Sequence, residues 1–286
     1  MTPGIEPGGF LLIDKPRGAT SHDAVAEVRR ALGMKKVGHA GTLDPMATGL
    51  LVVGVGRGTR LLRFLGDLTK VYEGSFRLGI ATDTLDADGT VTGREAVEGL
   101  SRERVADAMT ALEGDSLQTP PAYSAVKVGG RKLYEAARRG EVLRAAPRPI
   151  HVDRFELVGF DPPDVDFVVR CGAGTYVRVL AADVGDRLGT GAHLTDLRRT
   201  AIGPFTVAEA SSPGDPGEML PLERAVDHLP HLELDAEEAV AVTHGRILGP
   251  AGLGGPYAVF APDGRLLGVY RDEGAKARPE VILAPA

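Results

Sequence analysis

The chain of 286 residues has a single cysteine, Cys171, and no apolar run long enough to cross a membrane. One thiol excludes an intramolecular disulfide and a zinc site built from several thiolates, and it suits a reducing compartment, so we expect a cytoplasmic protein. A membrane-spanning helix needs about 18 or more apolar residues. The first ten residues, MTPGIEPGGF, also lack the basic and apolar regions of a secretory signal. We therefore expect no membrane association.

Basic residues are in deficit, with 33 Lys and Arg against 39 Asp and Glu and a net charge of −6. A nucleic-acid-binding protein is more often basic. The charge is uneven, however, because residues 120–154 contain eight basic and three acidic residues, whereas residues 213–245 contain one basic and eight acidic residues. Tyr123 and Tyr134 lie among the bases, and aromatic rings stack on unpaired RNA bases. Charged runs are commonly solvated faces, so charge alone leaves both interpretations open.

The chain shows no internal repeat and no low-complexity tract, and its glycines and prolines separate many short elements. Hydrophobic spacing and end signals predict strands over 10–13, 50–55, 71–78, 165–171 and 175–179, and helices over 23–32, 102–112 and 180–188. Because they follow no regular βαβ rhythm, we predict an α+β fold on a mixed, mostly antiparallel sheet. A break near Leu229-Pro230 divides a large domain, 1–229, from a small β-rich domain, 230–286, which contains a predicted hairpin around residues 262–265.

Residues 38–60 are the segment most suggestive of chemistry. The glycines at 54, 56 and 58 follow a strand, but neither the dinucleotide fingerprint nor the lysine of a Walker loop is present. Gly38 and Gly41 bracket His39, and Pro45 constrains the chain directly after Asp44. Such a loop can hold one carboxylate rigidly at a cleft, although Asp-Pro is more often only a turn. No clustered metal ligands accompany it, so we expect no metal.

The same segment, Gly38-His-Ala-Gly-Thr-Leu-Asp44-Pro-Met-Ala-Thr-Gly-Leu-Leu51, resembles the signature of the TruB family of bacterial tRNA pseudouridine-55 synthases. Further segments resemble the family in the same order: Leu12–Pro16, Lys70–Glu73, Arg77–Gly79, Thr82–Gly89, Pro121–Lys127, Lys132–Ala136, Gly174–Arg178 and His193–Arg199. The resemblance extends over residues 8–225. It implies a catalytic domain of mixed α/β structure and a small C-terminal domain of PUA type.

The resemblance also implies roles for individual residues. It implies that Asp44 is the catalytic carboxylate, that Tyr72 stacks on the flipped uracil, and that Arg178 pairs with the carboxylate. Leu197 would form an apolar wall of the pocket, and His39 would enter the T-loop. Lys15 and Pro16 would support the tyrosine from behind, and Asp86 falls on an acidic position linked to activity. Tyr176 completes the motif of Arg178. The insertion at about 120–150, with Lys127, Arg131 and Lys132, resembles the part that closes over the RNA stem-loop.

The implied reaction breaks the N1–C1′ bond of a uridine and rejoins the base through C5, so we expect no cofactor. A nearby Arg178 cation should lower the pKa of Asp44 by roughly 1–3 units. The expected partner is the T-arm of tRNA, and we expect a monomer that needs no protein partner. Two alternatives are an RNA-binding or RNA-folding module without catalysis and a nucleoside-type glycosidase. A glycosidase usually needs a second carboxylate about 5–10 Å away, for which Asp86 is the candidate.

Overall fold

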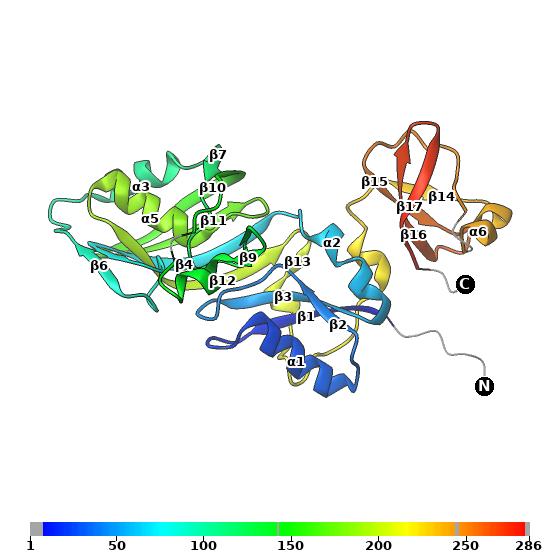
Figure 1. Ribbon diagram of the computed structural model, residues 1–286, viewed down its shortest axis with the longest axis horizontal. Helices are drawn as coiled ribbons and strands as arrows, with labels where there is room; N and C mark the ends of the chain where they lie inside the picture. The colour runs from blue at the N-terminus through cyan, green and yellow to red at the C-terminus, as the bar shows by residue number, and fades with distance from the viewer. Residues whose placement is uncertain (1–7, 142, 244–245, 284–286) are drawn as a thin grey trace.

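The computed structural model describes residues 8–141, 143–243 and 246–283, which form a nine-stranded sheet and a separate four-stranded sheet (Figure 1). Neighbouring strands are antiparallel, except that β12 runs parallel to β3 and β14 runs parallel to β15. The helices are few and do not alternate regularly with the strands. The predicted α+β class with a mixed, mostly antiparallel sheet is confirmed.

The large sheet has the strand order β1-β3-β12-β4-β11-β10-β7, with β2 paired to β3 and β13 paired to β12. Its strands are β1 (Gly9–Lys15), β2 (Val37–Ala40), β3 (Thr48–Val55), β4 (Lys70–Leu78), β7 (Gly114–Gln118), β10 (Arg148–Asp161), β11 (Asp164–Cys171), β12 (Ala192–Ile202) and β13 (Phe205–Thr206). The late strand β12 therefore lies between the early strands β3 and β4. This placement brings residues of a distant part of the chain between two early strands, in the middle of the sheet.

Two of the helices that cover this sheet begin after side-chain caps. Helix α1 (Ser21–Leu32) begins after Thr20, whose side chain accepts a hydrogen bond from the Asp23 amide, and ends at Gly33 in the left-handed conformation. Helix α3 (Arg102–Thr110) is capped by Ser101. Helices α3 and α5 (Val177–Leu188) contact each other and pack on β10 and β12 (Figure 1). Helix α2 (Leu62–Leu65) follows a short 3-10 helix.

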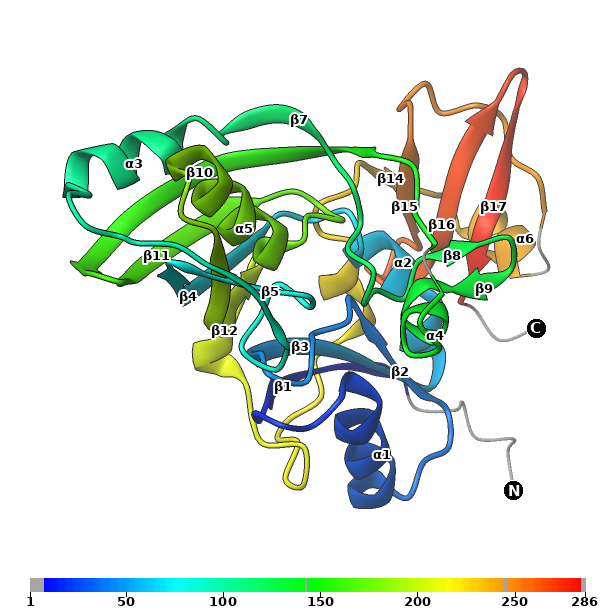
Figure 2. The same cartoon turned by 60° about the vertical axis from the view of Figure 1, so that its left-hand side comes forward.

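Two small hairpins extend from the large sheet. The first pairs β5 (Ile80–Thr82) with β6 (Val91–Arg94) and carries Asp86 in its connection. The second pairs β8 (Lys127–Val128) with β9 (Arg131–Lys132) and continues into α4 (Leu133–Ala137), and it is contained in the predicted insertion. Figure 2 shows β8, β9 and α4 outside the layers of the large sheet. The basic residues of the insertion are therefore presented on a projecting element.

The C-terminal sheet consists of β14 (His231–Glu233), β15 (Pro256–Phe260), β16 (Leu266–Glu273) and β17 (Lys276–Ile282), with α6 (Ala236–Thr243) beside it. The predicted hairpin is present as β15–β16. Apolar residues of both parts, among them Phe64 and Val269, share one buried cluster. Arg57 and Arg60 donate hydrogen bonds to the carbonyls of Leu283 and Ile282. Within the described residues, no helix has the length and apolar character needed to span a membrane.

One predicted element is wrong. Residues 175–179 were expected to form a strand, because Thr, Tyr and Val favour extended backbone. Instead α5 begins at Val177, with Tyr176 as its extended N-terminal flanking residue. The Tyr176 amide donates to the side chain of Gln118, and the Thr175 hydroxyl donates to the Gly172 carbonyl. The contact with distant Gln118 and the local contact with Gly172 turn the chain into the helix and place Arg178 in its first turn.

Candidate active site

The loop that carries Asp44 connects β2 to β3 and is held on both sides of the carboxylate. Before it, the Leu43 amide donates to the Ser21 hydroxyl at 2.9 Å. After it, the Pro45 carbonyl accepts hydrogen bonds from the Gly18 amide at 2.8 Å and from Lys15 Nζ at 3.4 Å. The backbone around Asp44 is therefore fixed by β1 and α1.

Arg178 joins this loop to Asp86. Its side chain is 5% exposed, and Nη2 lies 3.1 Å from one oxygen of Asp44 and 3.2 Å from the other. Nη1 lies 3.8 Å from Oδ2 of Asp86, whose side chain is 9% exposed. Arg178 also donates to the carbonyls of Thr84 and Tyr123, at 3.3 and 2.8 Å. One buried guanidinium thus connects both predicted carboxylates and the start of the insertion.

The carboxyl group of Asp44 is less easily ionised than predicted. Burial raises its pKa, the Arg178 charge opposes that increase, and the Asp86 charge adds to it. The net shift is upward, so the predicted lowering by Arg178 is present but outweighed. The reason is that the site shields the carboxylate, whose side chain is 37% exposed, from much of the surrounding water and places a second carboxylate on the same guanidinium.

Lys15 is completely buried at the end of β1. Its ammonium donates to the carbonyls of Ala19 at 2.7 Å and Pro16 at 3.1 Å, in addition to Pro45. Burial lowers the pKa of Lys15 to about 8, although the Asp44 charge opposes this effect. These hydrogen bonds place Lys15 behind the Asp44 loop, whereas Pro16 itself is exposed.

Tyr72 and Leu197 lie on the adjacent central strands β4 and β12, at 9% and 6% exposure. Both belong to one buried cluster that also contains Leu43 and Met46 of the Asp44 loop. Burial raises the pKa of the Tyr72 phenol, and the Arg199 charge opposes that shift. The tyrosine is therefore a neutral, apolar surface beside the carboxylate.

His39 lies on β2, with its ring at 5.5 Å from that of His22 in an edge-to-face arrangement. Its Nδ1 atom is buried and has no hydrogen-bond partner among the described residues. Burial and the neighbouring charges of His22 and Arg199 lower the pKa of His39 to about 4. The imidazole is therefore neutral at physiological pH.

This lowered pKa predicts a pH-dependent contribution to stability. Between pH 6.5 and about 4 the unfolded chain protonates His39 and the folded chain does not, so the free energy of unfolding falls as the pH falls through that window. His39→Gln should abolish this loss. Urea unfolding of both proteins at about pH 7.5 and 4.5 measures it, and an equal wild-type-to-variant difference at both pH values would contradict the prediction.

Tyr176 lies between two arginines. The Cζ atoms of Arg148 and Arg178 are 4.9 and 5.7 Å from the centre of its ring. Arg148 also donates to the Gly174 carbonyl at 2.6 Å. Tyr176 therefore contributes a cation–π contact beside Arg178.

The predicted basic contacts lie apart from the carboxylates. Lys127 and Arg131 are exposed on the β8–β9 hairpin, and Lys132 is partly exposed. Arg131 pairs with Glu141 at 2.7 Å, and Lys132 lies over the ring of Tyr134. The link to the site is Tyr123, whose carbonyl binds Arg178.

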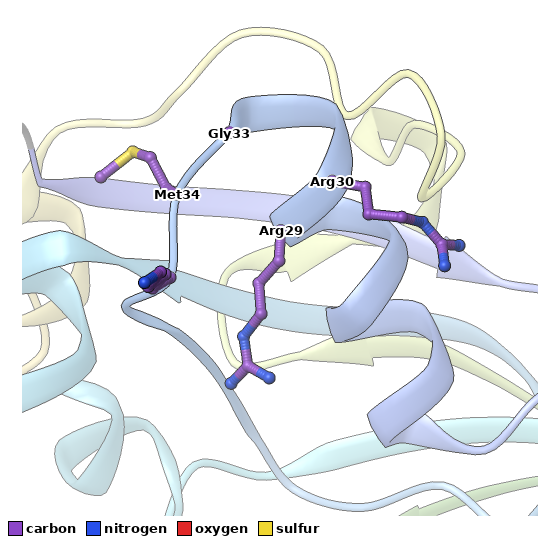
Figure 3. Close-up of a pocket in the computed structure, with 5 residues that line it drawn as sticks. Arg29, Arg30, Gly33 and Met34 are labelled. Atoms are coloured by element: carbon purple, nitrogen blue, oxygen red, sulfur yellow. The ribbon is translucent and has the colours of Figure 1, made fainter.

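An open pocket at the C-terminal end of α1 lies elsewhere. It is lined by Arg29, Arg30, Gly33, Met34 and Lys35, none of which is a predicted site residue (Figure 3). Arg29 donates to the Val37 carbonyl, and cations at a helix C-terminus are favourable in themselves. The described residues contain no group of three or more His, Cys, Asp or Glu that could hold a metal ion.

The sequence interpretation missed Arg199. This residue is only 1% exposed, and its guanidinium donates to the carbonyls of Leu50 and Gly41. A charged side chain is normally expected at the surface. Its signal was its place at the end of the segment His193–Arg199 that resembles the family, on a strand that the hydrophobic pattern did not predict.

Comparison with known proteins gives matches over nearly the whole chain. Residues 29–177 match the model described as TruB family pseudouridylate synthase (N terminal domain). Residues 178–213 match the tRNA pseudouridylate synthase B C-terminal domain, and residues 229–284 match tRNA pseudouridine synthase II, C terminal.

Among similar proteins, the tRNA pseudouridine synthase B of Mycobacterium sp. (strain KMS) is 45% identical, covering 98% of this chain and 97% of its own. That of Thermobifida fusca (strain YX) is 46% identical, covering 96% and 98%. The crystal structure of the archaeal box H/ACA sRNP Nop10–Cbf5 complex contains a chain that is 26% identical with a TM-score of 0.75, covering 98% of this chain and 87% of that one. The fold and these matches define a pseudouridine synthase. Within that class, the chain belongs to the TruB family.

Proposed function

We propose that this protein converts the uridine at position 55, in the T-loop of tRNA, to pseudouridine, with Asp44 as the catalytic carboxylate. The relatives that match along the whole chain are named as tRNA pseudouridine synthases, which supports a tRNA substrate. The observation that carries the proposal is the pairing of Asp44 with the buried guanidinium of Arg178, beside the ring of Tyr72.

The reaction requires an ionised carboxylate and a place for a free base to turn. In one route Asp44 attacks C1′, the N1–C1′ bond breaks, and the resulting Asp44–C1′ ester is displaced when C5 of the rotated base bonds to C1′. In the other route Asp44 removes the C2′ proton as the N1–C1′ bond breaks to give a glycal, and it returns that proton to C2′ as C5 bonds to C1′. In both routes the C5 proton leaves last and N1 ends protonated. The Arg178 charge favours the ionised form of Asp44 and opposes the effect of burial, and Tyr72 with Leu197 provides apolar walls for the base.

The uridine must leave its stack before Asp44 can reach it. Unstacking costs a few kcal/mol, which stacking on an aromatic ring and filling of the vacated space can offset. Tyr72 is suited to the first role, and His39, neutral and partly exposed on β2, to the second. The projecting β8–β9 hairpin would supply phosphate contacts.

A glycosidase function is disfavoured by the surroundings of Asp86. Its carboxylate accepts hydrogen bonds from the Thr84 hydroxyl at 2.6 Å and from the Asp88 amide at 3.2 Å. Its side chain is only 9% exposed. A second glycosidase carboxylate must meet water or the leaving group. Asp86 is instead placed to orient Arg178.

The test is release of tritium from C5-labelled uridine in a T-arm hairpin, because C5 loses its hydrogen when the new carbon–carbon bond forms. We expect release from the wild-type hairpin and none from one in which position 55 is replaced. Release that does not depend on position 55 would contradict the site, and no release from either RNA would contradict the activity. The single chain, without added protein, should be sufficient.

Charge reversal at Arg131 and Lys132 should weaken RNA binding and flatten its salt dependence. Each phosphate contact contributes about 0.7–0.9 to the slope of log affinity against log salt, so the double variant should lose roughly one to two units of slope. Filter binding at several salt concentrations measures this. Arg265→Glu, on the distant C-terminal hairpin, is the matched control and should keep the wild-type slope. An unchanged slope in the double variant would exclude this hairpin from the interface.

A further inference from the structure

Arg199 occupies the middle of the large sheet, between the two strands that lead to the site. On β12 it is paired with Gly49 of β3 on one side and with Tyr72 of β4 on the other. The approach to β3 is so close that a Cβ atom at Gly49 would lie 2.3 Å from the Arg199 carbonyl, and Gly49 has a φ of +100°. Glycine at position 49 therefore allows the chain to pass from the Asp44 loop into β3 directly against Arg199.

The guanidinium of Arg199 binds the chain on both sides of Asp44, at the start of its loop and within β3. Nη2 donates to the Gly41 carbonyl at 3.0 Å, three residues before Asp44, and Nε donates to the Leu50 carbonyl at 2.8 Å, six residues after it. Gly41 has a φ of +78°, and a Cβ atom there would lie 3.4 Å from Arg199 Nη1. A single planar group thus holds the chain before Asp44 at a fixed distance from the chain after it.

The same side chain also faces the predicted stacking tyrosine. The positive charge of Arg199 opposes the effect of burial on the Tyr72 phenol, and it also acts on Lys15 and His39. Arg199 therefore lies near three of the predicted site residues, and it is only 1% exposed.

A purely structural role would not require this residue. No ion pair of the described residues involves Arg199, and a buried cation without a carboxylate partner is costly, whereas an apolar side chain of similar volume would fill the space without that cost. What an apolar side chain cannot supply is a planar set of donors that point in different directions. The hydrogen bonds of Arg199 to the Gly41 and Leu50 carbonyls use that property.

We propose that Arg199 is a positioning residue that holds the Asp44 loop and the Tyr72 ring in a fixed relation for the reaction. The proposal rests on the proposed function, since the reaction is what its loss should slow. Displacement of reacting groups by about 1 Å can cost about 100-fold in rate while substrate contacts elsewhere persist. Arg199 should therefore affect the chemical step more than RNA binding.

The decisive variant is Arg199→Lys, which keeps the charge and loses the divergent donors. Under single-turnover conditions with the C5-tritiated hairpin, we expect the rate to fall by about 30- to 100-fold and the RNA dissociation constant to change by less than about threefold. Arg198→Lys is the matched control. Arg198 is the next residue on β12, but it pairs with Asp14 at 2.6 Å and is partly exposed, so both quantities should stay within about threefold of wild type.

A second variant keeps the test decisive if Arg199→Lys does not fold. Tyr72→Phe removes only the hydroxyl, on which the charge of the cross-strand neighbour Arg199 acts, and it should reduce the single-turnover rate by about tenfold without weakening RNA binding. When both variants fold, their effects should be less than multiplicative, because each removes the same contact. A wild-type rate in Arg199→Lys, or in Tyr72→Phe if only that variant folds, would overturn the proposal. A wild-type protein that releases no tritium would instead overturn the proposed function.

Discussion

Asp44→Asn should abolish pseudouridine formation while leaving RNA affinity nearly unchanged. The substitution keeps the size of the side chain and removes the negative charge on which both routes to N1–C1′ cleavage depend. Loss of a positioned acid–base or nucleophilic group costs at least about 10³-fold. Tritium release under single-turnover conditions measures the chemistry, and filter binding measures the affinity for the same hairpin.

Asp196→Asn provides the comparison for this variant. Asp196 lies on β12, next to Leu197, and is half exposed in an ion pair with Arg17. Its loss should change the rate by less than about threefold, because exposed ion pairs contribute little. Turnover retained by Asp44→Asn would refute the catalytic assignment. A parallel loss of RNA binding would instead indicate that Asp44 acts in recognition.

Arg178→Lys should lower the rate by about 100-fold and shift the pH profile. Arg178 contacts Thr84 through Nη1 and contacts Asp44 and Tyr123 through Nη2. The single ammonium nitrogen of lysine cannot occupy both of these positions. Burial raises the pKa of Asp44 and the Arg178 charge lowers it, so a weaker contact leaves that pKa still higher. Since Asp44 must be ionised, the acid limb of the profile should move to higher pH.

The control for this variant is Arg187→Lys, an exposed residue at the other end of α5. It should preserve both the rate and the acid limb. An Arg178→Lys profile that superimposes on that of the wild type would show that the guanidinium does not set the ionisation of Asp44. Reduced rate with an unshifted acid limb would mean that Arg178 acts through the insertion, by its hydrogen bond to Tyr123.

The pair formed by Asp44 and Arg178 shows where reasoning from residue types was insufficient. The pairing was predicted from motif resemblance, and the structure brings the two side chains together at 3.1 Å. The direction of the net pKa shift of Asp44 was not predicted, because it is a balance between the attraction of Arg178 and the cost of desolvation. The desolvation cost depends on how completely Leu43, Met46 and the neighbouring strands exclude water, which no local pattern reports.

Local signals were sufficient where the interactions that decide structure are themselves local. The capping of α1 by Thr20, its end at Gly33 and the alternation along β4 follow from residues within a few positions of one another. At residues 175–179 the same kind of signal failed, because Gln118, far away in the chain, determines where α5 begins. Propensity is a weak guide when a distant side chain binds the backbone.

The sequence by itself determined the kinds of group available to this protein: one carboxylate in a glycine-bounded loop, an aromatic residue on an alternating strand, and a basic insertion that the net charge of −6 conceals. Only the tertiary structure decided which charges are buried and what they face. Strand β12 pairs with both β3 and β4, although it follows them by more than 100 residues in the sequence. This pairing places Arg199 against both Gly49 and Tyr72. The physical reason is that burial and hydrogen bonding across a sheet depend on long-range register, which a single sequence does not encode in any short pattern.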